Sequence, residues 1–322
     1  THTQCVHLKL ARSSPADALS RTSKTMFGIL NLNKPSGPTS RACVSAIEKL
    51  VRPLKAGHAG TLDPIANGVL LVLVGQAVRL TDAIHTLPKE YVGRFQLGVT
   101  SESADTESEL IPLVGAATLT RECIERILPK YTGHIEQTPP KFSAIWIDGK
   151  RAHELAREGK SFEIPSRKVH IEEIELTDFD GNSFELRIRC GTGTYVRSLG
   201  RDIALELGSD AVMTHLTRTA IGPFSIQQSC SLDSMTDLVA VEKELAPPRL
   251  GVQHWQQATP SEEVLLKLEQ GKSVMQEELE ASTPWTEDYA AVVDTAGRLR
   301  ALVKKIGPQL WRADKCFLLS MQ

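Results

Sequence analysis

The stretch that decides the fold is Gly57-His58-Ala59-Gly60-Thr61-Leu62-Asp63-Pro64, followed shortly by the apolar run Val69-Leu70-Leu71-Val72-Leu73-Val74. The apolar run is typical of a buried strand. The glycines permit a tight turn, and Pro64 biases Asp63 toward an extended backbone. A loop of this kind can pack against a ligand while it holds one carboxylate in a fixed direction. Asp63 is therefore a candidate functional group, with a simple cap of the turn as the alternative.

Length and composition indicate a globular protein. The chain has 322 residues, 41% of them hydrophobic and 24% charged, which suits one large domain and one small one. No apolar run approaches the roughly 20 residues that span a bilayer, and residues 1–25 lack the apolar block of a signal peptide. We expect a cytoplasmic protein that does not enter a membrane.

The six cysteines stand singly along the chain. There is no C-x-x-C pair and no histidine at zinc-finger spacing from a cysteine. This pattern is typical of reduced thiols, and we expect no bound metal.

The charge is nearly balanced, with a formal net charge of -2. A protein of this charge cannot bind nucleic acid by bulk attraction, so any such role must depend on a local patch. Residues 141–170 supply one, because Lys and Arg outnumber Asp and Glu there, whereas the segment from Ser231 onward leans acidic until its last 25 residues. A solvated face is the alternative for such a charge run.

The periodicity along the chain favours an α+β fold. Residues 1–25 are polar and aperiodic, and we expect a flexible leader. The later patterns alternate between strands, turns and helices without a βαβ repeat. Strands are expected at 28–32, 69–74 and 91–97, a hairpin at 169–176 with 184–190, and helices at 39–51, 77–85, 121–131 and 196–207.

A composition shift between 231 and 248 predicts a domain boundary. The segment beyond this boundary is short, and strands expected at 290–293 and 299–303 flank a turn at 294–297. We therefore expect a large domain over 26–230 and a small β-rich domain over 231–322.

Four side chains from three separate segments stand at loop or element-end positions: Asp63, Tyr91, Tyr195 and Arg197. Active sites are commonly assembled from such positions on a rigid scaffold. Spacing alone does not identify the chemistry.

Six ordered motifs lie at 28–37, 55–70, 89–91, 149–151, 193–199 and 216–224. In this order they resemble the TruB-type RNA pseudouridine synthases, over most of residues 27–226. The resemblance implies a mixed, largely antiparallel sheet with inserted helices, an RNA-gripping insertion at 141–170, and a C-terminal module that resembles a PUA domain weakly.

The implied reaction isomerises uridine to pseudouridine in the T-loop of tRNA, at position 55. It proceeds by base flipping and a catalytic aspartate, needs no cofactor, and brings no redox change. The implied enzyme is a monomer that binds the T-arm without an obligatory protein partner.

The resemblance also implies roles for the central residues. Asp63 is the catalytic aspartate, Arg197 pairs with its carboxylate, and Tyr91 stacks on the target uracil. Either nucleophilic attack or proton abstraction needs ionised aspartate, and a nearby arginine lowers the pKa that burial raises. An aromatic ring under the base contributes roughly 1 to 3 kcal/mol and tolerates its rotation.

Other residues carry supporting roles by resemblance. His58 packs against the bases where the target nucleotide leaves its stack. Tyr195 and Leu216 form pocket walls, and Lys34 and Arg218 support the motifs. For these four a plain packing role is the alternative.

The basic stretch supplies the expected phosphate contacts: Lys141, Lys150, Arg151 and Arg157. Three nearby positions depart from the family pattern. Phe142 replaces a tyrosine, Trp146 begins an apolar pair where a more polar one is usual, and His153 stands where a tyrosine is common.

Other functions stay open on the sequence alone. The chain could act as the catalytic subunit of a guide-RNA particle, or as a non-catalytic RNA-binding chaperone. An aspartyl hydrolase of sugars or phosphates fits less well, because the chain shows no spaced second carboxylate, metal cluster or Gly-Lys-Ser/Thr phosphate loop.

Overall fold

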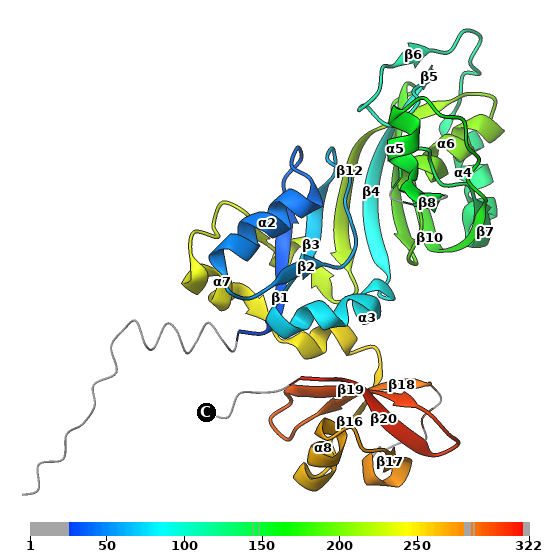
Figure 1. Ribbon diagram of the computed structural model, residues 1–322. Coiled ribbons are helices and arrows are strands. Elements are labelled where there is room, and N and C mark those ends of the chain that lie inside the picture. Colours follow the sequence, from blue (N-terminus) through cyan, green and yellow to red (C-terminus); the bar gives the residue numbers. More distant parts are fainter. Residues whose placement is uncertain (1–25, 144, 148, 280–284, 286, 318–322) are drawn as a thin grey trace, which may run out of the picture.

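A computed structural model describes residues 26–317 except 144, 148, 280–284 and 286 (Figure 1). For His153 it describes the backbone only. The leader expected at residues 1–25 lies outside this range. Within the described residues a large mixed sheet and a separate five-stranded sheet confirm the predicted α+β class.

The large sheet has the order β14-β1-β3-β12-β4-β11-β10-β7. β13, β15 and β2 pair with β12, β1 and β3. Most pairings are antiparallel, and β3 with β12 and β1 with β14 are parallel. The strands are β1 (Gly28–Lys34), β2 (Ala56–His58), β3 (Asn67–Val74), β4 (Lys89–Leu97), β7 (Gly133–Gln137), β10 (Arg167–Phe179), β11 (Ser183–Cys190), β12 (Ala211–Ile221), β13 (Phe224–Ser225), β14 (Cys230–Ser231) and β15 (Leu245–Ala246).

β3 forms the buried centre of one half of the sheet. Its residues from Gly68 to Val74 are all buried, since β1 and β2 pair with it and helices cover its faces. The continuous apolar run predicted this burial, because a strand covered on both faces needs no polar alternation.

The predicted hairpin is confirmed in the other half of the sheet. β10 and β11 pair around the turn at 180–182, and β11 alternates buried and less buried residues along Ser183–Cys190. Asp180 holds this turn, because its carboxylate accepts hydrogen bonds from the backbone of Asn182 and Ser183 at 2.9 and 2.7 Å.

Two of the four predicted helices are observed close to their predicted ranges. α2 (Ser40–Leu50) is capped by the Thr39 hydroxyl, and α6 (Val196–Glu206) packs on β4 so tightly that a Cβ at Gly200 would lie 2.1 Å from Phe95. The remaining helices are α4 (Arg121–Ile127), α5 (Ala152–Arg157), α7 (Leu238–Glu244) and α8 (Glu262–Glu269).

Two predicted helices begin or end differently. The pattern at 77–85 is divided into a 3-10 turn, η1 (Gly75–Leu80), and a short helix, α3 (Thr81–His85). The helix predicted at 121–131 ends at Ile127, and η2 (Leu128–Tyr131) continues it as a 3-10 turn with Pro129 near its start. Pro129 lacks the amide hydrogen that would continue the α-helical ladder.

Two short two-stranded sheets and several 3-10 turns complete the fold. β5 (Val99–Thr100) and β6 (Ile111–Pro112) form a two-stranded antiparallel sheet, and β8 (Trp146–Ile147) and β9 (Lys150–Arg151) form another within residues 141–170. The remaining 3-10 turns are η3 (Ile226–Gln228), η4 (Pro248–Val252) and η5 (Gln276–Leu279).

The second sheet has the order β16-β18-β19-β20-β17. Figure 1 shows it below the end of the large sheet that carries α3, whereas β5 and β6 lie at the top. Its strands are β16 (Gln256–Ala258), β17 (Val274–Met275), β18 (Tyr289–Val293), β19 (Leu299–Lys305) and β20 (Leu310–Cys316).

A shared apolar cluster joins the two sheets. Val293 and Leu302 of the small sheet pack in one buried cluster with Ile29 of β1, and the rings of Phe27 and Phe317 stack at 5.2 Å. This burial fixes the small domain against the large one.

Residues just after the expected boundary at 231 pair with the large sheet. β14 and β15 both lie beside β1, and α7 packs near α2. The boundary between residues 230 and 231 stays a prediction, and this pairing favours a later one, between Ala246 and Gln256.

Candidate active site

The loop that carries Asp63 joins β2 to β3 and is fixed from several sides. The Ser40 hydroxyl at the start of α2 accepts a hydrogen bond from the Leu62 amide at 2.8 Å and donates to the Leu62 carbonyl at 3.0 Å. The Asp63 carbonyl accepts from the Ala66 amide at 3.1 Å. The loop backbone is therefore ordered on both sides of the carboxylate.

Lys34 and Arg218, the expected supports, both hold this loop through its carbonyl groups. Buried Lys34 Nζ donates to the carbonyls of Pro64 at 3.3 Å and Ala66 at 2.7 Å. Arg218 Nη2 and Nη1 donate to Gly60 at 3.0 Å and Thr61 at 3.3 Å. Two buried cations thus stand behind the Asp63 loop without pairing with its carboxylate.

Arg197 does contact the carboxylate. Its Nε lies 3.0 Å from Asp63 Oδ2, and its Nη1 lies 2.9 Å from Asp105 Oδ2. The Arg197 side chain is 5% exposed, that of Asp63 33%, and that of Asp105 1%. One buried guanidinium therefore joins two carboxylates, of which only Asp63 reaches solvent.

Asp105 is a member of this group that the sequence did not reveal. Its carboxylate accepts from the Ser103 hydroxyl at 2.6 Å and from the Glu107 amide at 3.0 Å. The neighbouring Ala104 has φ of 58°, an unfavourable value for a residue with a side chain. Such backbone strain is common at functional sites. The only sequence signal was an acidic residue in a polar loop.

The guanidinium of Arg197 is also held by carbonyl groups. Nη1 donates to Ser103 at 2.9 Å and Nη2 donates to Phe142 at 3.0 Å. Its planar fork therefore has a fixed orientation toward Asp63.

Burial and charge oppose each other at Asp63. Removal from water raises the pKa of its carboxyl, Arg197 lowers it, and Asp105 raises it again, with a net shift upward. The sequence predicted that an arginine would counter the effect of burial. In the structure Arg197 does so only in part, because burial has the largest effect on the pKa of Asp63 and the Asp105 charge adds to it.

Tyr91 and Leu216 line the apolar side of the site. They lie on β4 and β12 and pack in the cluster that contains Leu62, which precedes Asp63. The Arg218 guanidinium lies 6.0 Å from the centre of the Tyr91 ring. Burial raises the pKa of the Tyr91 hydroxyl, so it stays protonated near neutral pH.

His58 lies at the end of β2 with its Nδ1 buried and without a hydrogen-bond partner. Burial and the charge of Arg218 lower the pKa of its ring, so His58 is neutral near pH 7. A neutral imidazole is flat and can stack on a base, while its Nδ1 atom lies buried inside the protein.

Tyr195 stands at the N-cap position of α6, two residues before Arg197. Its ring lies below the guanidinium of Arg167, with 5.0 Å between the guanidinium carbon and the ring centre. The segment that presents Tyr195 therefore also sets the start of the helix that carries Arg197.

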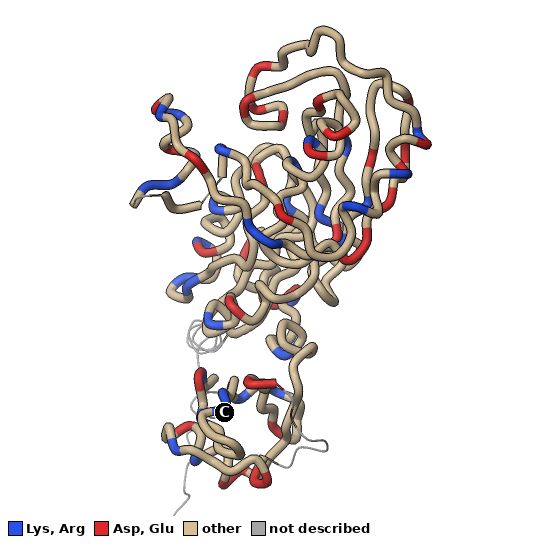
Figure 2. The backbone as a smooth tube through the Cα atoms, turned by 90° about the vertical axis from the view of Figure 1, so that its right-hand side faces the viewer, with Lys and Arg blue, Asp and Glu red and all other residues tan. Residues whose placement is uncertain are grey.

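The basic residues of the 141–170 insertion are spread over its elements. Lys150 pairs with Glu158 at 3.0 Å, and Arg151 lies 4.3 Å from the centre of the Trp146 ring. Arg157 is exposed at the end of α5. Figure 2 shows blue and red segments interspersed along the described part of the chain.

The departures from the family pattern have defined surroundings where the structure describes them. Phe142 offers its backbone carbonyl to Arg197. Trp146 is 61% exposed. The side chain of His153 lies outside the described part.

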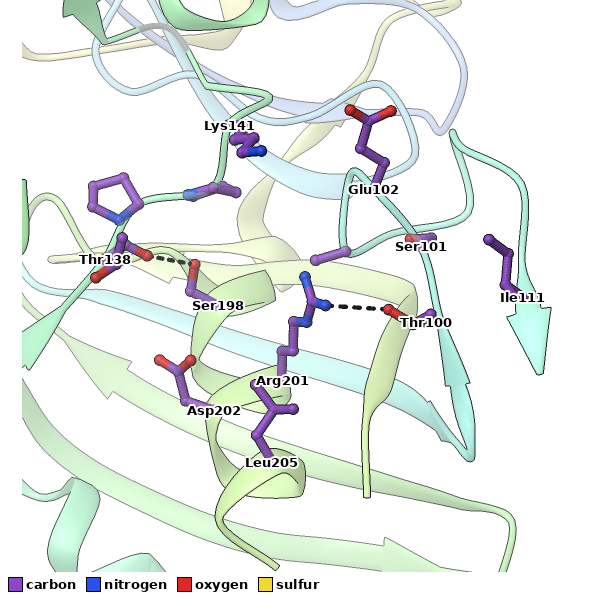
Figure 3. Close-up of a pocket in the computed structure, with 13 residues that line it drawn as sticks. Thr100, Ser101, Glu102, Ile111, Thr138, Lys141, Ser198, Arg201, Asp202 and Leu205 are labelled. Atoms are coloured by element: carbon purple, nitrogen blue, oxygen red, sulfur yellow. Dashed lines mark hydrogen bonds between the residues drawn. The ribbon is translucent and has the colours of Figure 1, made fainter. Parts of the chain in front are cut away.

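A cavity of about 520 Å³ lies beside this group and does not include Asp63. It is lined by residues of the β5 loop, the start of the insertion and α6, and Figure 3 shows Thr138 bonded to Ser198 and Thr100 bonded to Arg201 across it. Among the described residues, no group of three His, Cys, Asp or Glu side chains is placed to hold a metal ion. Nor does any helix in that part have the length and apolarity to span a membrane.

Comparison with known proteins bears on this geometry. Residues 48–196 match the family described as TruB family pseudouridylate synthase, N-terminal domain. A tRNA pseudouridine synthase B of Rhodopirellula baltica is 41% identical over 228 residues, which make up 69% of this chain and 66% of that relative.

Two further similarities cover more of the chain. The tRNA pseudouridine synthase B of Dehalococcoides mccartyi is 34% identical over 299 residues, or 91% of this chain and 97% of the relative. A chain of a solved Cbf5-Nop10-Gar1 complex superposes with a TM-score of 0.73 at 26% identity, over 92% of this chain and 87% of the other.

Proposed function

This chain belongs to the TruB family of pseudouridylate synthases, and from that premise we propose that it isomerises uridine to pseudouridine at position 55 in the T-loop of tRNA, with Asp63 as its catalytic carboxylate. The observation that carries this proposal is the buried arrangement in which Arg197 joins the partly exposed Asp63 to the enclosed Asp105.

The reaction suits a site with one exposed carboxylate. The N1–C1′ bond of uridine breaks, the uracil turns, and a C5–C1′ bond forms, after which the C5 proton is lost and N1 gains one. Asp63 can attack C1′, attack the base, or take a sugar proton. All three roles require its ionised form.

Arg197 keeps this carboxylate aligned and favours its ionised form. Its guanidinium donates to Asp63 from a buried position, where the interaction is screened less by solvent than at the surface. Asp105 fixes the opposite edge of the same guanidinium. Arg197 and Asp105 together therefore hold Asp63 in position before the substrate binds.

The apolar wall holds the base that must turn. Stacking on the Tyr91 ring stabilises the uracil without fixed hydrogen bonds, so it is compatible with rotation. Leu216 and Tyr195 complete the wall, and neutral His58 fills the place that the flipped nucleotide leaves. Lys34 and Arg218 keep the Asp63 loop in position.

The 141–170 insertion binds the T-arm in this proposal. Lys141, Lys150, Arg151 and Arg157 contact phosphates, and this local charge replaces the bulk attraction that a chain of net charge -2 lacks.

The proposed enzyme works as a cytoplasmic monomer, without a cofactor or an obligatory protein partner. The relatives are named tRNA pseudouridine synthase B, which favours a stand-alone enzyme over a guide-RNA subunit. Light scattering of the active protein tests the monomer, and activity of the purified chain without added protein or guide RNA tests independence.

Mapping of pseudouridine in an unmodified tRNA transcript tests the proposed reaction. We expect one pseudouridine, at the T-loop uridine, and none in a matched transcript with cytidine at that position. Tight binding of the transcript without product would instead identify an RNA-binding protein, and product at another uridine would refute the proposed target.

A further inference from the structure

The 141–170 insertion leaves and rejoins the large sheet at a single cross-strand pair. Gln137 is the last residue of β7 and Arg167 is the first of β10, and the two are partners in the antiparallel register. These two residues therefore hold the two ends of the insertion side by side at the edge of the sheet.

Gln137 binds both backbone groups of Tyr195. Its Nε2 donates to the Tyr195 carbonyl at 3.0 Å, and its Oε1 accepts from the Tyr195 amide at 2.8 Å. Gln137 is 1% exposed, so these bonds are shielded from water. The N-cap residue of a helix has a free amide and no side-chain cap here, and the glutamine supplies the missing partner.

Arg167 holds the same segment from the other strand. Its Nη2 donates to the Gly193 carbonyl, and its guanidinium lies over the Tyr195 ring. Gly193 has φ of 86°, and a Cβ there would lie 3.2 Å from Arg167. Only a glycine permits both this conformation and this close approach without displacing the arginine.

The chain that follows β7 also bonds to α6. The Ser198 hydroxyl donates to the Thr138 carbonyl at 3.0 Å, as Figure 3 shows. Arg197 Nη2 donates to the Phe142 carbonyl at 3.0 Å. The first turn of the helix that presents Arg197 therefore bonds to Thr138, just before the insertion, and to Phe142 within it.

We propose that Gln137 and Arg167 are positioning residues for pseudouridine formation, which act by fixing the Tyr195 backbone and, through the first turn of α6, the Arg197 guanidinium against Asp63. The inference rests on the proposed function. Neither residue has a described contact with Asp63.

The physical reason is the steep dependence of catalysis on geometry. A displacement of about 1 Å at a positioning group can lower a rate by about 100-fold. Tyr195 has no other described support for its backbone than the start of α6 and these side chains, so loss of the Gln137 bonds frees the residue that begins the helix.

Three substitutions separate this role from RNA attraction and from folding. Gln137→Ala removes both bonds to Tyr195, and Gln137→Glu keeps the acceptor but sets a carboxylate against the Tyr195 carbonyl. Arg167→Met removes the bond to Gly193 and keeps the apolar stem. Lys168→Met is the matched control, because it removes the same charge one residue away, from an exposed side chain on the opposite face of β10.

The readout is the single-turnover rate at saturating tRNA, beside the Kd for tRNA and the thermal midpoint of each variant. We expect the rate to fall about tenfold or more in the Gln137 and Arg167 variants, with Kd nearly unchanged, and to stay at the wild-type value in Lys168→Met. A loss confined to Kd, or a wild-type rate in the folded variants, would overturn the inference.

A double-mutant cycle with Arg197→Lys tests the proposed route. If Gln137 acts through Arg197, the fall caused by Gln137→Ala shrinks when Arg197 is already replaced. An undiminished fall would contradict that route. If Gln137→Ala does not fold, Gln137→Glu and Arg167→Met take its place. An inactive wild type would refute the proposed function, whereas an active wild type with active variants refutes only this inference.

Discussion

The pKa of the Asp63 carboxyl is set by its burial and by two neighbouring charged residues. Burial and Asp105 raise its pKa, and Arg197 lowers it. The sequence predicted Asp63 and Arg197, because both stand in recognisable motifs. It did not predict Asp105, since that residue reaches the site through a loop whose path depends on Ser101, Ser103 and the strained Ala104.

The pH dependence of the reaction depends on this balance. Because the reaction needs ionised Asp63 and its pKa lies above the usual aspartate range, the rate should fall on acidification at a higher pH than for an ordinary aspartate. Asp105→Asn should move this acidic limb to lower pH, because Asp105 raises the pKa of Asp63. Single-turnover rates across the acidic range check this, with circular dichroism as the control for folding. A limb unmoved by Asp105→Asn would contradict the assignment.

Asp105 should also matter for stability. Asn in place of Asp105 removes a buried charge-assisted contact, but Arg197 keeps Asp63 as its partner. A hydrogen bond to a charged group contributes about 1.5 to 3 kcal/mol, and we expect Asp105→Asn to lower the free energy of unfolding by about this amount in urea titrations. Asp178→Asn, at a half-exposed pair with Arg94, is the control and should change it little.

Local elements with strong periodicity were predictable, and elements defined by distant partners were not. The apolar run of β3 and the alternating pattern of β11 each predict a strand from the local sequence alone. β12 carries two interruptions of register, beside His215 and Ala220, and its place between β3 and β4 depends on residues far along the chain. Its regular pattern is therefore hidden in the sequence.

The β8–β9 hairpin of the 141–170 insertion presents an aromatic surface. Trp146 is largely exposed, and Arg151 covers one side of its ring, which leaves the ring open to a base. Trp146→Ala should weaken tRNA binding by about 1 to 3 kcal/mol. The salt dependence of Kd should stay unchanged, since no charge is lost. Filter binding over a salt series checks this, and an unaltered Kd at every salt concentration would show that the ring does not bind RNA.

The two domains share part of their core. Sequence predicted a small β-rich domain and two of its strands, but not β20, whose pairing with β19 and β17 is needed to define it. Nor did composition indicate that residues 230–231 and 245–246 pair with β1, because an acidic segment can still supply a few backbone hydrogen bonds. Figure 1 shows α7, within this segment, beside α2 at the edge of the large sheet.

Phe317 tests the contribution of the domain contact to stability. Its ring is fully buried and stacks on Phe27. Phe317→Ala should lower the free energy of unfolding by about 3 to 5 kcal/mol. Tyr289→Ala, at an aromatic residue 39% exposed on the same domain, should cost much less. Equal effects in urea titrations would argue against a shared core.

The most direct test of the account is the Asp63→Asn variant under single-turnover conditions with an unmodified tRNA transcript. Asparagine keeps the size of the side chain and removes the ionisable group, so we expect no pseudouridine and nearly unchanged tRNA binding. Pseudouridine formed by the Asp63→Asn enzyme at a rate near that of the wild type would contradict the account.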